Sequence, residues 1–267
     1  MEKRIKILGL ALTLGLSLTL CPVKGLQGRD DFDDTENLTS INPKTSQLQQ
    51  TGPINSEQKI TKSLQFKNSR QRILSYLFEG KKSFEEGVRL NNQKDFSGAA
   101  DKFRKALIYL EKTDSVQSIA LTHLNLAICL QNLQQKEESL CHFNTALDLS
   151  RKYGFKHYEA KALQGRGLIL NSMNEKDEAI ICLEKALEIH RSVFDISGEA
   201  IDWLIKGIIE RDRNTDRARS YFECALRISQ EIGDPSLERR SYYWLEQLRE
   251  YLFKKQSRGE EDGSFIL

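Results

Sequence analysis

Proline is scarce in this chain of 267 residues, and its distribution is uneven. Of the 4 prolines, Pro22, Pro43 and Pro53 lie near the N-terminus, and the rest of the chain contains only Pro235. A β-sandwich with many proline- and glycine-rich turns is therefore excluded. Long stretches without a helix breaker instead favour an all-α fold for the body of the protein.

The chain also lacks a large excess of charge of either sign. Its 40 lysines and arginines nearly balance its 38 aspartates and glutamates, which leaves a formal net charge of +2. A dedicated nucleic-acid-binding protein normally has a clear basic excess, so no nucleic-acid partner is expected. Hydrophobic residues make up 39% of the chain, which is enough for a sizeable core and excludes disorder over the whole length.

Recognisable catalytic motifs are missing as well. The sequence has no glycine-rich phosphate loop, no nucleophile elbow and no HExxH zinc motif. The 4 histidines are His123, His142, His157 and His190, and no two of them have the i, i+4 spacing of a helical metal site. We therefore expect no catalytic residue, no metal site and no cofactor, and we interpret the protein as a non-enzyme.

Cysteine is rare, and its spacing matches no zinc motif. Beyond residue 25 the cysteines are Cys129, Cys141, Cys182 and Cys224, which lie 12, 41 and 42 residues apart. Each falls in a predicted helix, where a lone cysteine usually acts as a small buried apolar residue. Cys141 and Cys182 occupy neighbouring places in adjacent units, so they are the pair to test for a disulfide.

One long uncharged run is present, and it lies at the N-terminus. Basic residues precede the apolar run 7–21, and the small residue Gly25 follows it. This is the layout of a secretory signal peptide, and the run is short for a membrane span, which needs about 20 apolar residues. We expect residues 1–25 to be a cleaved signal peptide. A retained membrane anchor is the alternative, and a segment that is neither stays open.

Residues 26–68 differ in composition from the rest of the chain. They are rich in Asp, Thr, Ser, Asn and Gln, and their few apolar residues show no period. A segment of this kind cannot bury enough apolar surface to offset the entropy lost when it becomes ordered. We therefore predict a disordered polar linker over 26–68.

The body of the chain is an internal repeat. A five-residue pattern occurs four times, in which a large apolar residue is followed by two variable positions, an alanine and a leucine. One small residue lies four positions before each pattern, and another lies 11 or 12 positions earlier still. The pattern alanines are Ala106, Ala146, Ala186 and Ala225, at intervals of 40, 40 and 39; the nearer small residues are Ala99, Ser139, Ala179 and Ala218, and the farther ones are Gly87, Ala127, Gly167 and Gly207.

The spacing of small and large residues has a physical meaning. Two helices approach to about 8–10 Å only where the side chains at the crossing are small. A glycine or alanine in each helix supplies that gap, and a phenylalanine or leucine fills the space beside it. One such hairpin cannot bury its apolar face alone, so successive hairpins must stack.

This pattern resembles the tetratricopeptide repeat family. The shared motif is small–x11–small–x3–Phe–x2–Ala, and Trp203 takes the family's aromatic position four residues before Gly207. The resemblance covers residues 80–231 and implies a right-handed superhelix of stacked helical hairpins. The family's usual period is roughly 34 residues, and the proline that commonly ends the second helix is absent here. The chain is therefore similar to a long, 40-residue variety of the repeat.

The same pattern sets the expected helices. Gly154 and Gly233 are predicted to end helices, and Asp234 followed by Pro235 to begin the last one. That last helix has a polar outer face and is expected to cap the stack. The repeat domain is predicted over 69–254 and a mobile tail over 255–267. The predicted helices are 69–92, 96–112, 116–133, 136–153, 157–173, 176–192, 198–212, 215–231 and 235–254.

The resemblance also implies a binding surface. In the family the first helices of the hairpins line a concave groove, whose partner-contacting positions form here an apolar row beside a row of carboxamides. Carboxamides donate and accept hydrogen bonds, which suits an extended main chain, and Asn125 is the residue most expected to hold one. The alternative is that these amides only solvate the rim of an empty groove. The expected groove residues are Val88, Asn91, Asn92, Leu124, Asn125, Ile128, Gln131, Asn132, Gln164, Leu168, Asn171 and Ile208.

A charged clamp that the family uses for a C-terminal carboxylate fits this sequence badly. The clamp needs Lys and Asn where this chain has Phe84 and Val88, and a basic residue where it has Gly165. Only Asn125 and Lys161 match. We therefore expect a partner segment with hydrophobic anchors rather than an acidic tail.

We interpret the chain as an exported, non-catalytic scaffold that holds a segment of a protein partner in its groove. It would act in a periplasm, a lumen or outside the cell. The alternative is a structural assembly factor that self-associates through its terminal helices and takes no peptide ligand. Membrane contact is expected only if the N-terminal segment is retained, and the oligomeric state stays open.

Overall fold

The computed structural model describes residues 56–263 and places side chains over residues 67–255. Within the described range, every residue lies in an α-helix or in a short turn between helices. This confirms the all-α fold class for that part of the chain. The predicted signal over 1–25, and the predicted linker as far as residue 55, lie outside the described residues.

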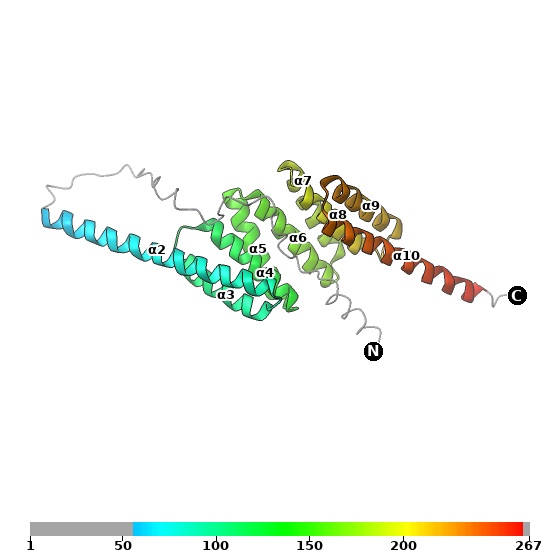
Figure 1. The fold of residues 1–267 in the computed structure, drawn as a ribbon, viewed down its shortest axis with the longest axis horizontal. Coiled ribbons are helices and arrows are strands. Elements are labelled where there is room, and N and C mark those ends of the chain that lie inside the picture. Colours follow the sequence, from blue (N-terminus) through cyan, green and yellow to red (C-terminus); the bar gives the residue numbers. More distant parts are fainter. Residues whose placement is uncertain (1–55, 264–267) are drawn as a thin grey trace. The chain divides into compact units, whose positions relative to one another are not determined.

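The chain divides by its contacts into two units, with the boundary between Ser139 and Leu140. In each unit the helices pack against their neighbours in the chain (Figure 1). The first unit contains α2 (Ser56–Asn92), α3 (Phe96–Leu110), α4 (Val116–Asn132) and the start of α5 (Lys136–Tyr153). The second contains the rest of α5, α6 (Lys156–Ser172), α7 (Lys176–Ser192), α8 (Ile196–Glu210), α9 (Thr215–Ile232) and α10 (Pro235–Gly263).

The bounds of the internal helices agree with the sequence prediction to within two residues, but the two terminal helices are longer than predicted. α2 begins at Ser56 instead of 69, and α10 ends at Gly263 instead of 254. The stretch 56–68 contains neither proline nor glycine and is rich in Glu, Gln, Lys and Leu. Helix propensity therefore continues the helix beyond the apolar pattern that set the predicted boundary. The helical region extends past both limits of the predicted repeat domain.

Helix ends follow the predicted signals. Gly233 ends α9 with a left-handed backbone (φ 66°), and Gly154 has φ 78° after α5. Asp234 then caps α10, because its Oδ1 accepts hydrogen bonds from the backbone N–H groups of Ser236 and Leu237 at 2.9 and 3.0 Å. These contacts confirm the predicted stop and restart.

The small residues of the repeat lie where helices cross. A Cβ atom added to Gly87 would lie 2.7 Å from the ring of Phe103, and one added to Gly207 would lie 2.4 Å from the ring of Phe222. Both rings are fully buried, as is Ala127 at the corresponding position of α4. The prediction that these positions face neighbouring helices rather than solvent is confirmed.

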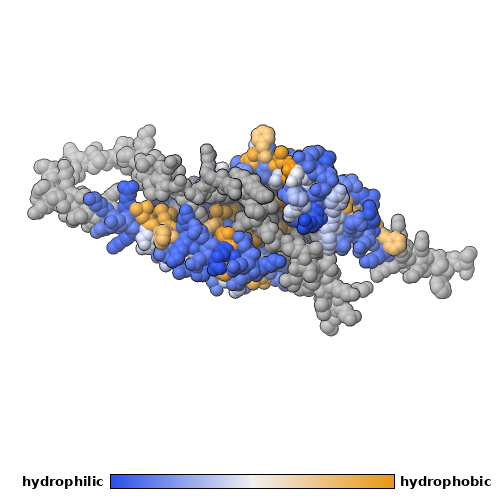
Figure 2. All heavy atoms as spheres, in the orientation of Figure 1, coloured by the Kyte–Doolittle hydropathy of each residue, from blue (hydrophilic) through white to orange (hydrophobic). Residues whose placement is uncertain are grey.

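Most of the visible surface of the described residues is polar, with a few apolar patches (Figure 2). One patch lies on α2, where Leu74 and Phe78 are exposed. Another lies at the turn between α7 and α8, where Phe194 is 88% exposed. Phe194 also has φ 58°, in the left-handed region that a bulky residue rarely adopts. Gly154 serves the corresponding turn one hairpin earlier without that strain.

Candidate functional site

The predicted groove residues of the first unit lie on α2 and α4, two helices that contact each other. The structure brings them to adjacent helices but exposes them unequally. Asn91, Leu124 and Asn125 are buried, Asn92 is exposed, and Val88, Ile128, Gln131 and Asn132 are partly exposed. A partner could therefore reach only some of the predicted residues in this structure.

Several of the predicted amides form hydrogen bonds inside the protein. Asn125 is 3% exposed, and its Nδ2 donates to the carbonyl of Leu121 at 2.9 Å. The Nδ2 of Asn132 likewise donates to a carbonyl of its own helix at 2.8 Å. Asn91 Oδ1 accepts from the thiol of Cys129 at 3.6 Å, and burial raises the pKa of that thiol to about 12, so it keeps its proton. The amide row is therefore only partly available to a ligand.

Gln131 is different from the other amides of this unit. It is a partly exposed residue on α4, yet its Oε1 atom is buried and has no hydrogen-bond partner. Leaving a buried acceptor unsatisfied costs about 1–3 kcal/mol. Because that oxygen is enclosed by the protein, a bound segment could donate to it only after the side chain turned outward. Ile128 lies three residues earlier on the same helix, so it offers apolar contact beside the amide.

The predicted residues of the second unit lie on α6 and α8, which also contact each other. Leu168 and Asn171 on α6 and Ile208 on α8 are partly exposed. Gln164 is 4% exposed, so it does not belong to the accessible surface. Of the groove residues predicted in this unit, only the apolar residues Leu168 and Ile208 and the amide of Asn171 are accessible to a partner.

Gln164 belongs to a buried polar cluster that the sequence analysis missed. Its Nε2 donates to Oδ1 of Asp202 at 2.9 Å, and Nδ1 of His190 lies 2.7 Å from the other carboxylate oxygen. Asp202 and His190 are both buried. Burial raises the pKa of Asp202, although the hydrogen bond from His190 acts in the opposite direction. The cluster links α6, α7 and α8 and serves the packing of this unit.

This cluster could have been predicted by comparing the residues at equivalent positions of successive hairpins. The position of His190 is held by Leu110 and Ser150 in the two preceding hairpins, and that of Asp202 by Thr122 and Ala162. All four are fully buried. A histidine and an aspartate at two interior positions must find polar partners, and each is the nearest charged partner for the other.

A second missed feature surrounds Lys206 on α8. This residue is 4% exposed, and its Nζ lies 5.1 Å from the ring centre of Trp203 and 5.0 Å from that of Tyr221. Its Nζ also lies 3.3 Å from Oε1 of Glu184 on α7. The two ring faces and the carboxylate stabilise the ammonium group. Trp203, the aromatic residue of the repeat motif, thus packs between α7, α8 and α9.

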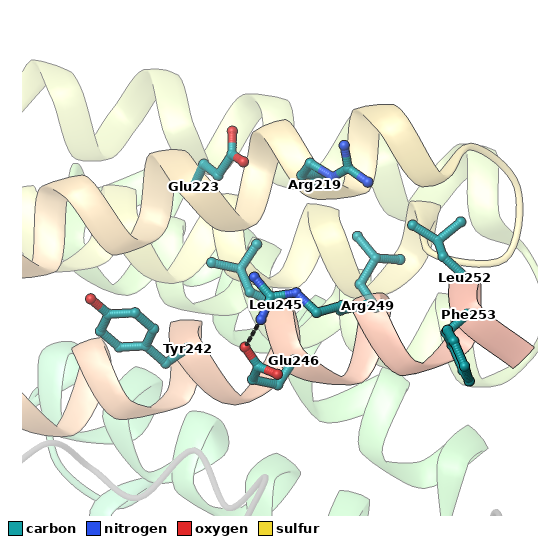
Figure 3. A pocket seen from close by; sticks show the side chains of 9 residues that line it. Arg219, Glu223, Tyr242, Leu245, Glu246, Arg249, Leu252 and Phe253 are labelled. Atoms are coloured by element: carbon teal, nitrogen blue, oxygen red, sulfur yellow. Dashed lines mark hydrogen bonds and ion pairs between the residues drawn. The ribbon is translucent and has the colours of Figure 1, made fainter.

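A hollow of about 590 Å³ lies between α9 and α10 in the second unit (Figure 3). Leu245 and Leu252 extend from α10 toward α9, and Glu246 pairs with Arg249 beside them at 2.7 Å. An apolar floor with paired charges at its rim suits a protein surface better than a small polar substrate. The lining residues are Arg219, Glu223, Tyr242, Leu245, Glu246, Leu248, Arg249, Leu252 and Phe253, and none of them is a predicted groove residue.

Other kinds of site are limited in the part of the chain that the structure describes. There, no group of three or more His, Cys, Asp and Glu side chains is arranged to hold a metal ion. No helix in that part combines the length and the apolar character that a membrane span requires. Cys129, Cys141, Cys182 and Cys224 have free thiols. Cys129 and Cys182 are buried as expected, but Cys141 is exposed and Cys224 is only partly buried. The expected buried place is wrong for Cys141 because it lies on the solvent-facing side of α5.

Residues 118–192 match the family model of the tetratricopeptide repeat. No curated protein matches the chain significantly. Three solved structures are similar. The crystal structure of a Rap protein complexed with Competence and Sporulation Factor has a TM-score of 0.60 and 21% identity, covering 71% of this chain and 53% of that chain. Aspartyl phosphate phosphatase F from Bacillus subtilis has a TM-score of 0.57 and 16% identity, covering 71% and 52%. BtubC from P. vanneervenii has a TM-score of 0.53 and 16% identity, covering 74% and 93%.

This chain spans about half the length of the first two of these proteins. At such low identity the likeness concerns the fold alone, and it agrees with the helical hairpins described above. The described helices therefore form a tetratricopeptide-like repeat fold, and residues 118–192 match the family model of the tetratricopeptide repeat.

Proposed function

We propose that this protein is an interaction scaffold that holds a segment of another protein against the first helices of its hairpins. Each unit offers its own contact surface, which is Ile128 with Gln131 in the first unit and Leu168 with Ile208 in the second. All four are partly exposed on the helices that the repeat family uses for binding. The family match and the repeat fold support a protein partner as the ligand class.

The observation that carries this proposal is the partly exposed Ile128 beside the partly exposed Gln131 on one first helix. An apolar side chain next to a carboxamide is complementary to a segment that brings a hydrophobic anchor and a main-chain polar group. One of the similar structures is a Rap protein complexed with Competence and Sporulation Factor, so a protein with a similar fold is known in a complex, which supports the proposal.

Photo-crosslinking tests the proposal directly. A photoreactive amino acid replaces Ile128 or Leu168 in the full chain, expressed in its source cells. The matched controls are Ile108 on α3 and Ile181 on α7, which are exposed isoleucines on second helices. We expect discrete adducts with a partner protein from Ile128 and from Leu168, each tested on its own, and none from the controls. Equal labelling at all four positions, or labelling at the controls alone, would refute the proposal.

We also propose that the scaffold works outside the cytoplasm. The support for export is the layout of residues 1–25, which carry a basic start, an uncharged run and a small residue before the predicted cut. N-terminal sequencing of the mature protein should find a chain that starts after Gly25. An intact N-terminus on a protein that stays in the cytoplasm would contradict this.

A further inference from the structure

The last two helices carry a second apolar surface that the proposed function does not use. Tyr242, Leu245, Arg249 and Leu252 lie on α10 at successive spacings of 3, 4 and 3 residues, the a and d positions of a heptad. All four line the hollow between α9 and α10 (Figure 3). Phe253, at its end, is 70% exposed. A stripe of this spacing is typical of a helix that pairs with another helix.

The length of α10 also favours a further neighbour. α10 has 29 residues and α9 has 18, and the two helices run side by side from the turn at Gly233. α10 therefore extends past the start of α9 by about 11 residues, or roughly 16 Å at the rise of an α-helix. Figure 1 shows this extension at the C-terminal end of α10. α10 therefore offers a length of helix beyond the start of α9 along which a further helix could lie.

The charges along the stripe indicate which partner fits. Glu246 and Arg249 are exposed and form an ion pair at 2.7 Å within one helix. In an antiparallel pair of two α10 helices centred between residues 247 and 248, each Glu246 would face Arg249 of the second copy. The same geometry would place Tyr242 opposite Phe253 of the second copy. Tyr242, Glu246, Arg249 and Phe253, spaced 4, 3 and 4 residues apart, thus form one exposed face that is complementary to itself in charge and in aromatic contact, as a two-fold interface requires, while Leu245 and Leu252 are directed toward α9.

The α9 side of the hollow also carries one positive and one negative charge. Arg219 and Glu223 lie one turn apart on α9 and line the hollow with one charge of each sign. A second copy of α10 entering there meets neither a wholly basic nor a wholly acidic wall. A strongly charged partner of one sign would find no such match. We propose that α10 pairs antiparallel with α10 of a second copy of this chain, so that the protein forms a two-fold dimer through the α9–α10 hollow.

Charge reversal combined with mixing tests this dimer. Sedimentation of the full chain should show a dimer whose dissociation depends on concentration. Glu246→Arg places arginines opposite arginines, and Arg249→Glu places glutamates opposite glutamates, so each variant alone should dimerise at least tenfold more weakly. An equimolar mixture of the two variants should restore a dimer that contains one chain of each. A fault in folding cannot be rescued by mixing, so recovery identifies the interface itself.

The control uses an ion pair outside the hollow. Arg227 and Glu231 on α9 form an exposed pair at 2.7 Å and do not line the hollow, so their reversal should leave the dimer unchanged. A wild-type chain that stays monomeric at all concentrations would overturn the proposal. So would single reversals that leave the dimer intact, or a mixture that does not recover. Crosslinking at Ile128 and Leu168 does not depend on these residues, so either proposal can fail alone.

Discussion

Replacing Gly207 by alanine tests the packing argument at a repeat glycine of the second unit that lies against a buried ring. The new Cβ would lie 2.4, 2.6 and 2.9 Å from three atoms of the Phe222 ring, where ordinary contact begins near 3.4 Å. The ring cannot withdraw easily, because it is fully buried and stacks on Trp244 with ring centres 6.0 Å apart. Overpacking of this kind in a core costs about 1–3 kcal/mol.

Part of that cost is offset by the helix itself. Alanine is favoured over glycine in a helix by about 0.8–1.0 kcal/mol. The net loss expected for Gly207→Ala is therefore about 0–2 kcal/mol, from the difference of these two effects. The matched control is Gly167→Ala, whose Cβ would approach the carbonyl of Ala179 and the side chain of Leu183 no closer than 3.2 Å. There the two effects nearly cancel, and the free energy of unfolding should change little.

Tryptophan fluorescence during urea unfolding is the suitable assay. The chain has 2 tryptophans, Trp203 and Trp244, and both lie in the second unit with Gly207 and Gly167. A double substitution of Gly207→Ala with Phe222→Leu should recover part of the loss, because the smaller side chain makes room for the methyl group. The packing argument is refuted if Gly207→Ala is more stable than the wild type, or if Gly167→Ala loses more than Gly207→Ala.

Three further predictions concern stability. Phe194→Gly should raise the free energy of unfolding by about 0.5–1 kcal/mol, because glycine adopts a positive φ without strain, whereas Gly154→Ala should lower it in the same urea titration. Since burial raises the pKa of Asp202, the folded state binds that proton more tightly than the unfolded state does. The unfolding free energy of the wild type minus that of Asp202→Asn should therefore fall as pH rises above the ordinary aspartate pKa. A difference that stays constant with pH would contradict this prediction. Phe143→Ala should cost about 3–5 kcal/mol in thermal or urea unfolding, because it empties the space beside Gly165; a loss below about 1 kcal/mol would exclude a tightly packed ring.

Much of the fold could be predicted because its determinants are local and periodic. The bounds of α5 and α7 agree with the prediction, since small residues and turn signals recur around them. The ends of α2 and α10 could not be predicted in the same way. The outer turns of both helices lack the apolar stripe on which the prediction relied, and those of α10 also contain Gly259 and Gly263.

The candidate surface was harder to predict than the fold. Asn125 and Gln164 occupy binding positions of the repeat family, yet both are buried here. A family position specifies the helix face, but the neighbouring helix decides how much of that face remains open. The partner that buries Gln164 is Asp202, and it lies 38 residues away, beyond the reach of local patterns.

The most direct test of the proposed scaffold is a comparison of partner affinity between two variants. Isothermal titration would measure the segment captured by crosslinking, made as a synthetic peptide, against Leu168→Asp on α6 and Ile181→Asp on α7. The proposal predicts at least a tenfold loss of affinity for Leu168→Asp, because an aspartate on the contact surface must be desolvated, and no change for Ile181→Asp. Unchanged affinity for Leu168→Asp together with a loss for Ile181→Asp would place binding on the second helices and contradict the proposal.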